Sequence, residues 1–167
     1  MTRFSLTFFL LLFGLAAAAT AADSTLEFTA AEFAETDAGA VPYYFDKRRM
    51  ALAVNAAVVE YRNKFARASI TFTGDAGTYT VVIKAMRETD GDCTYRLFVN
   101  DELIGTGTNG ETEVDYSPQE HHFTGVEIPA GAKLSVESNA VTNGKIPEGD
   151  GTAFARGRWT ALAVDPE

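Results

Sequence analysis

Short segments in which apolar and polar residues alternate, separated by turn residues, constrain the fold of this chain more than any other feature. Between 78 and 86, apolar side chains occupy every second position, from Tyr79 to Ala85. This is the period of a strand with one buried face. Comparable segments occupy residues 68–73, 93–99, 102–105, 123–128, 134–137 and 159–164. Strands this short, at this spacing, indicate an all-β sandwich.

One segment has a different period. Met50, Val54, Val58, Tyr61 and Phe65 are three or four positions apart, which is typical of an amphipathic helix over 47–66. The same residues also allow two strands, 50–54 and 57–61, joined at Asn55. The local pattern leaves both alternatives open.

Cys93 is the only cysteine, so the chain can form no intrachain disulfide and its core must hold the fold. Cys93 shares a strand face with Tyr95, Leu97 and Val99. That position predicts a buried, inert thiol rather than a reactive nucleophile.

The first 22 residues have the layout of a cleavable secretory signal. A basic start at Arg3 precedes an apolar run from Phe4 to Leu15 and a small-residue stretch that ends at Ala22. The apolar run is shorter than the roughly 20 residues that span a bilayer. We therefore expect a signal peptide at 1–22, a single domain at 23–167, and a secreted or periplasmic protein.

Charge narrows the classes of partner. Arg3 is the only charge in the signal, and its removal leaves 13 basic and 23 acidic residues, a net charge of −10. Such a surface repels phosphate backbones and anionic lipid, so we expect neither nucleic acid nor a membrane surface as partner. It suits divalent cations, or neutral polymers that need no electrostatic attraction.

Several motifs resemble those of the galactose-binding-like jelly rolls, and within these the carbohydrate-binding modules of families 6 and 35. The motifs are Gly77-Thr78-Tyr79-Thr80-Val81, the strand and hairpin from Tyr95 to Asn100, the strand pair from Val126 to Val136, and the closing segment from Ala155 to Val164. The resemblance implies a jelly-roll β-sandwich that binds carbohydrate, and it favours strands over a helix at 47–66.

The resemblance also implies a structural calcium site that clamps the first strand to the last. Glu27 or Glu32 matches the acidic residue of the first strand, and Asp165 matches that of the last. Calcium takes six to eight oxygen ligands, so backbone carbonyls would have to complete the site. The alternative is that all three carboxylates are solvated surface charges.

No recognised catalytic motif is present in the sequence. Sugars stack on aromatic rings, and their hydroxyls bond to amides, carboxylates and guanidinium groups. Side chains of these types lie in or beside two long loops expected at 106–120 and 139–157, or in the segment after Pro42. The candidate sugar-binding residues are Tyr43, Tyr44, Asn109, Tyr116, His122, Asn143, Arg156 and Trp159.

Several of these residues have structural alternatives. Trp159 is also a candidate core residue, Arg156 a candidate partner of Glu88 or Asp90, and His122 a candidate surface residue. Tyr43 and Tyr44 are consecutive and cannot both be buried on one sheet face, so their roles stay open. The sequence as a whole predicts a secreted, non-catalytic module that binds polysaccharide or oligosaccharide. A structural or adhesive sandwich with a protein partner, and a small polysaccharide-degrading enzyme, are the two alternatives.

Overall fold

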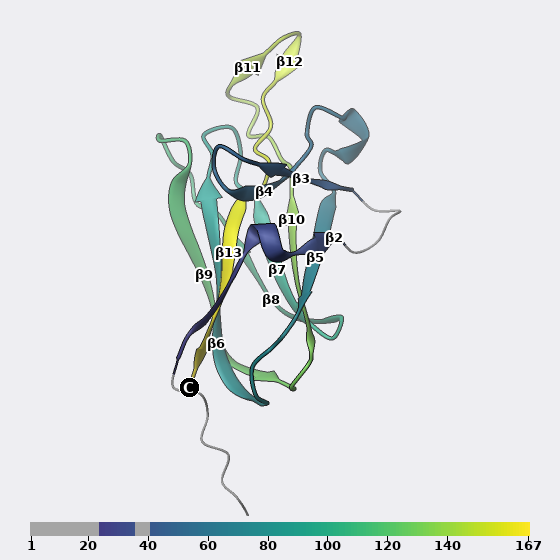
Figure 1. The fold of residues 1–167 in the computed structure, drawn as a ribbon. Helices are drawn as coiled ribbons and strands as arrows, with labels where there is room; N and C mark the ends of the chain where they lie inside the picture. The colour runs from purple at the N-terminus through teal and green to yellow at the C-terminus, as the bar shows by residue number, and fades with distance from the viewer. Residues whose placement is uncertain (1–23, 36–40) are drawn as a thin grey trace, which may run out of the picture.

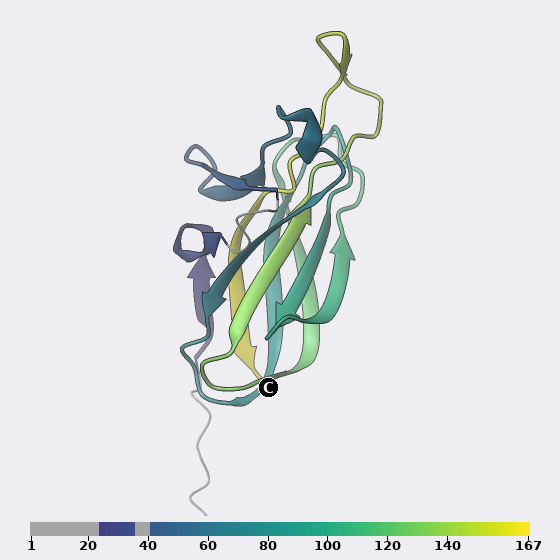
Figure 2. The same ribbon diagram turned by 90° about the vertical axis from the view of Figure 1, so that its right-hand side faces the viewer.

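The computed structural model describes residues 24–35 and 41–167, and the predicted signal peptide lies outside them. Two antiparallel sheets pack face to face (Figures 1 and 2). The six-stranded sheet contains β1 (Leu26–Thr29), β3 (Tyr43–Asp46), β4 (Ala51–Val54), β6 (Gly77–Arg87), β9 (Ser117–Ile128) and β13 (Trp159–Pro166). The five-stranded sheet contains β2 (Ala34–Glu35), β5 (Phe65–Thr71), β7 (Thr94–Val99), β8 (Glu102–Thr108) and β10 (Lys133–Asn139). The predicted β-sandwich is confirmed.

Strand order follows from how the chain crosses between the sheets. The six-stranded sheet has the order β3-β4-β13-β6-β9, with β1 also paired to β13, and the five-stranded sheet has the order β2-β5-β10-β7-β8. β9 pairs with β6, whereas β10 pairs with β5 and β7, so the turn at 129–132 carries the chain from one sheet to the other.

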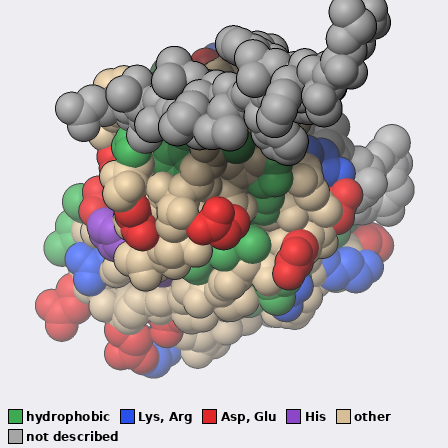
Figure 3. Space-filling view, turned by 90° about the horizontal axis from the view of Figure 1, so that it is seen from below, with side chains coloured by type: hydrophobic (Ala, Val, Ile, Leu, Met, Phe, Trp, Pro, Cys, Tyr) green, Lys and Arg blue, Asp and Glu red, His purple; other side chains and the backbone are tan. Residues whose placement is uncertain are grey.

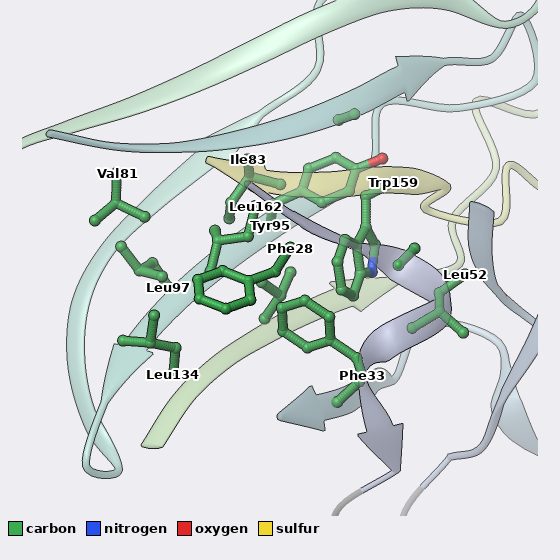
Figure 4. Packing of buried hydrophobic residues seen from close by; sticks show 14 of the residues in the cluster. Phe28, Phe33, Leu52, Val81, Ile83, Tyr95, Leu97, Leu134, Trp159 and Leu162 are labelled. Atoms are coloured by element: carbon green, nitrogen blue, oxygen red, sulfur yellow. The ribbon is translucent and has the colours of Figure 1, made fainter. Parts of the chain in front are cut away.

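The alternating apolar residues fill the space between the sheets. Trp159, Tyr95 and Leu97 are fully buried, and Figure 4 shows the Phe33 ring against the Trp159 indole. Their ring centroids are 4.8 Å apart at an interplanar angle of 88°, a favourable edge-to-face arrangement. Cys93 is 1% exposed, and burial raises the pKa of its thiol, so the prediction of an inert thiol agrees with its environment.

Residues 47–66 do not form a helix. Ala51–Val54 is strand β4, as one of the two alternatives predicted, and its four side chains are buried. The second predicted strand, at 57–61, is wrong. Residues Val59–Tyr61 form a short 3-10 turn (η2), and Val59 is 64% exposed. A tight turn that follows β4, with Val58 N–H bonded to the Asn55 carbonyl, takes the chain away from the sheet edge.

The hairpin predicted at Asn100-Asp101 joins β7 to β8. Both residues have positive φ, 48° and 68°, as a two-residue turn of this kind requires. The loop expected at 106–120 is shorter than predicted, because β8 continues to Thr108 and β9 begins at Ser117. Gly107 allows this, since a Cβ there would lie 2.4 Å from the His121 ring of β9.

The two ends of the sandwich differ. The end opposite the C-terminus, at the top of Figure 1, gathers the turns at 47–50 and 88–93, the loop at 109–116 and the segment 140–158. We call it the loop end. Segment 140–158 includes the small hairpin of β11 (Pro147–Glu148) and β12 (Gly151–Thr152). Figure 3 shows the opposite end, where acidic and basic side chains in view are scattered rather than gathered. In the described residues, no helix has the length and apolarity needed to cross a membrane.

Candidate functional site

A polar pocket of about 460 Å³ opens at the loop end. It lies among the β6–β7 turn, the β8–β9 loop and the segment that follows β10. Its lining side chains are carboxylates, hydroxyls, an amide and one amine. They belong to Glu88, Thr89, Asp92, Glu111, Thr112, Glu113, Asn143 and Lys145.

Hydrogen bonds from short polar side chains hold the three segments together. Thr89 donates from its backbone N–H and its hydroxyl to Asp115 Oδ1, at 2.8 and 2.9 Å. Asn143 Nδ2 donates to the Thr89 carbonyl at 2.9 Å, and the Asn143 N–H bonds to the Asp90 carbonyl at 2.8 Å. The pocket is therefore a built feature of the fold rather than a gap between independent loops.

The pocket wall is acidic. Four carboxylates face one amine, and Lys145 Nζ is already paired with Glu111 at 2.8 Å. Glu88 is the most buried of the four, and burial raises the pKa of its carboxyl to about 7 against the opposing effect of Arg158. Burial also raises the pKa of Asp90 in the same turn. Acceptor oxygens of this kind suit ligand hydroxyl groups, which donate hydrogen bonds.

A buried ion-pair network adjoins the pocket and includes Glu88 of its wall. Arg158, whose side chain is 6% exposed, forms an ion pair with Glu88 and a second one, at 3.1 Å, with Asp46 at the end of β3. Its third contact is to the Tyr44 hydroxyl at 3.2 Å. Glu88 thus belongs both to the pocket wall and to the network, and it connects the pocket to strand β3.

Four of the predicted sugar-binding residues lie at or beside this site. Asn143 lines the pocket, and Arg156 donates from Nη1 to the Tyr44 hydroxyl at 2.9 Å. Tyr116 ends the β8–β9 loop, and the Arg49 guanidinium lies 3.4 Å from its ring centroid. The alternative role of Arg156 is also observed in part, because its backbone N–H, rather than its side chain, bonds to Glu88 Oε1 at 3.0 Å.

The structure places the other four outside the pocket lining. Tyr43 and Trp159 are buried in the core, 6.2 Å apart, so neither presents a ring face to a ligand. Asn109 is 4% exposed and is bonded to the Met86 carbonyl and to His121. His122 is exposed on β9 beside Glu120, away from the pocket. Strand alternation accounts for three of these positions, because it turns Tyr43 and Trp159 inward and His122 outward.

The residues present do not fit the expected calcium site. β1 pairs with β13, so the first and last strands lie side by side as the resemblance implied. The carboxylates, however, have protein partners. Glu27 pairs with Lys84 at 2.6 Å, Glu32 accepts from the Thr29 N–H at 2.7 Å, and Asp165 accepts from the Thr25 hydroxyl. Within residues 24–35 and 41–167, no three His, Cys, Asp or Glu side chains are grouped to hold a metal ion.

Most of the pocket wall was not predicted. Glu88, Asp92, Glu111, Glu113 and Lys145 lie in turns that the sequence marks as polar, and no periodicity there shows which of them converge. One signal was present, namely the concentration of three acidic residues in the turn 88–92.

Comparisons with known proteins place the fold. No family model matches the sequence. A curated relative, Uncharacterized protein P23 of Formosa agariphila, is 28% identical over 107 residues. That alignment covers 62% of this chain and 24% of the relative, so the chain matches about a quarter of the relative's length.

Solved structures of carbohydrate-binding modules match nearly the whole sandwich. A CBM36 domain of a multidomain xylanase from the hindgut metagenome of Trinervitermes trinervoides has a TM-score of 0.55 at 14% identity, covering 86% of this chain and 98% of that one. The C-terminal CBM6 of a marine laminarinase from Zobellia galactanivorans has a TM-score of 0.51 at 15% identity, covering 85% and 99%. A family 35 module from Clostridium thermocellum has a TM-score of 0.51 at 12% identity, covering 86% and 99%. The chain has the β-sandwich fold of carbohydrate-binding modules of families 6, 35 and 36.

Proposed function

We propose that this protein is a secreted, non-catalytic carbohydrate-binding module whose ligand site is the pocket at the loop end. The observation that carries the proposal is the lining of that pocket. It combines carboxylate, hydroxyl, amide and amine groups in a cavity of about 460 Å³, on a fold that carbohydrate-binding modules share. Acceptors and donors that converge in this way match the hydroxyl groups of a sugar ring.

Aromatic groups supply less of this site than we expected from the sequence. Tyr44 and Tyr116 are linked to Glu88 by the arginines that contact both them and Glu88. Arg156 bonds to the Tyr44 hydroxyl, and Arg49 and Arg158 lie over the Tyr116 ring, so both tyrosines already have partners. We therefore assign most of the affinity to hydrogen bonds in the pocket, with Tyr44 and Arg156 at its rim.

The contacts and burial of Glu88 favour a binding role for the pocket over hydrolysis. A carboxyl with a pKa of about 7 in a pocket is typical of a general acid, and this observation supports the enzyme alternative. Both oxygens of Glu88 are occupied, however. Oε1 accepts from the Arg156 N–H, and Oε2 accepts from Arg158. The side chain is only 4% exposed, so a leaving group in the pocket has little access to its oxygens.

Affinity gel electrophoresis against a panel of plant and algal polysaccharides tests this proposal, together with an assay for released reducing ends. We expect retardation by at least one polymer without release of sugar. Retardation with turnover would favour the enzyme, and no retardation by any polymer would favour a sandwich with a protein partner.

Variants locate the site. Glu113→Ala and Asn143→Ala remove lining groups, and we expect each to weaken binding by roughly 1–3 kcal/mol, as truncation of an interface anchor does. Glu102→Ala, on β8 at the opposite end, is the matched control because Glu102 is also an exposed carboxylate. Equal affinity of all three variants would place the binding site elsewhere on the sandwich.

A further inference from the structure

The turn between β3 and β4 is basic in an otherwise acidic protein. Lys47, Arg48 and Arg49 are consecutive, and they account for three of the 14 basic residues in a chain with 23 acidic ones. Lys47 and Arg48 are exposed. Among the described residues, no carboxylate lies within ion-pair distance of either side chain.

Asp46 fixes this turn beside the pocket. Its Oδ1 accepts from the Arg48 N–H at 3.1 Å, and its Oδ2 accepts from Arg158 Nε at 3.1 Å. Arg158 in turn contacts Glu88 of the pocket wall. Arg49 is paired with Asp46 Oδ2 at 3.4 Å and lies over Tyr116, where the loop that lines the other side of the pocket ends. It therefore positions the turn, and Lys47 and Arg48 carry the unpaired charge. The turn is thus linked to both sides of the pocket.

Arg156 adds a further cation to the same region. Its Nη1 donates to the Tyr44 hydroxyl at 2.9 Å, and within the described ranges its guanidinium forms no ion pair with a carboxylate. A guanidinium has five N–H donors, in a fork that matches a carboxylate or a sulfate group. Most of its donors are therefore open to a ligand.

We propose that Lys47, Arg48, Arg49 and Arg156 form a basic rim that binds an anionic substituent of the polysaccharide whose sugar ring enters the pocket. This inference rests on the proposed function and names the ligand class: a polymer that carries carboxylate or sulfate groups as well as free hydroxyls. It revises our expectation of a neutral polymer, which rested on the net charge alone.

The rim can attract an anion although the net charge of the protein is −9, because electrostatic interactions in salt act only over a short range. At physiological ionic strength the screening length is about 8 Å, so distant acidic residues have little effect on a charge at the rim. The pocket carboxylates still repel an anion that enters the pocket itself. The two regions together suit a polymer with separated charges, and they disfavour a uniformly charged one such as nucleic acid.

The test compares charged and neutralised forms of the same polymers. The probes are a sulfated galactan with its desulfated form, and polygalacturonate with its methyl ester, each in affinity gels at low and moderate salt. The rim variant is Lys47→Gln with Arg48→Gln. The control, Lys84→Gln with Lys133→Gln, changes the net charge equally at two partly exposed, ion-paired lysines outside the loop end.

We expect one charged form to bind more tightly than its neutralised form, and the difference shows whether sulfate or carboxylate is recognised. The rim variant should lose about tenfold in affinity for that form, the effect of roughly 1.4 kcal/mol, with little change for the neutralised form or in the control. Equal binding of charged and neutral forms would overturn the rim and leave the proposed function intact. Equal retardation by single-stranded DNA would also overturn it, as a non-specific anion surface. Binding of no polysaccharide in any form would remove both proposals.

Discussion

Neighbouring residues at the loop end belong to two regions with different physical roles. Tyr43 and Trp159 point inward and form part of the core, whereas Tyr44 and Arg158, the residues next to them, point toward the charged network below the pocket. The core region is apolar and closely packed. The network and the rim are polar and are connected to the loop-end pocket through Glu88. Residue type alone therefore did not show which of the predicted residues lie at the pocket, because the direction of each side chain places it in the core or in the network.

Trp159→Ala should have the largest effect on stability. The indole is fully buried and packs against Phe33, so we expect a loss of about 3–5 kcal/mol in the free energy of unfolding. Tyr44→Ala should lose less stability, because the Tyr44 ring is only partly buried. Urea unfolding of the two variants measures both values. A smaller loss of stability for Trp159→Ala than for Tyr44→Ala would contradict the assignment of Trp159 to the core and of Tyr44 to the polar network.

Arg158→Met should have the next largest effect. It leaves Glu88 buried without its cation, which costs about 3–5 kcal/mol when the carboxyl is ionised. The loss should be greater at pH 8 than at pH 5.5, because Glu88 can take up a proton at the lower pH. Arg156→Met is the control, since its side chain pairs with no carboxylate among the described residues and should cost less than about 1 kcal/mol. Equal losses in the two variants would show that the network is not buried as described.

Stability should depend on pH through Glu88. Burial raises the pKa of its carboxyl from 4.5 to about 7 in the folded protein, so the folded state holds the proton more tightly than the unfolded state does. The stabilisation from this group is complete below pH 4.5 and is lost as the pH rises through 7. His121 opposes this trend, because burial lowers the pKa of its imidazole.

The difference between wild type and Glu88→Gln isolates the contribution of Glu88. Relative to the variant, we expect wild type to lose stability between pH 4.5 and 7.5 in chemical unfolding at a series of pH values. A difference that stays constant over this range would contradict the raised pKa.

Calcium should have the smallest effect. The candidate ligands Glu27, Glu32 and Asp165 all bond to protein groups, so we expect the melting temperature to be nearly the same in calcium and in chelator. A rise of several degrees in calcium that is absent from Asp165→Asn would restore the site implied by the family resemblance, since a ligand at 100 times its dissociation constant adds about 2.7 kcal/mol.

The sequence predicted the sandwich because alternation directly reports which face of a strand is buried. Tyr79, Val81 and Ile83 are all buried as the period implied, and Asn100 and Asp101 form the expected hairpin turn. The spacing over 47–66 did not distinguish a helix from a strand, because small alanines fit both the helical and the strand period. Pairing with β3 and β13 selects the strand at β4.

The site was less predictable, since it depends on contacts between distant segments. Glu88 and Arg158 are 70 positions apart, and nothing in the local pattern of either one specifies the other. Asn143 and Arg156 were selected because loop amides and guanidinium groups are general sugar ligands, and the structure places them at or beside the pocket. The same reasoning selected Asn109, which closes a buried network instead.

Whether the loop-end pocket binds carbohydrate is tested most directly by isothermal titration calorimetry with the polysaccharide that gives the strongest gel retardation. We predict saturable binding by wild type and by Glu102→Ala, with Kd increased roughly 5- to 150-fold in Glu113→Ala and Asn143→Ala, which corresponds to about 1–3 kcal/mol. Unfolding measurements must show that the pocket variants remain folded. Wild-type Kd values in both pocket variants, or no binding by the wild-type protein, would contradict the account.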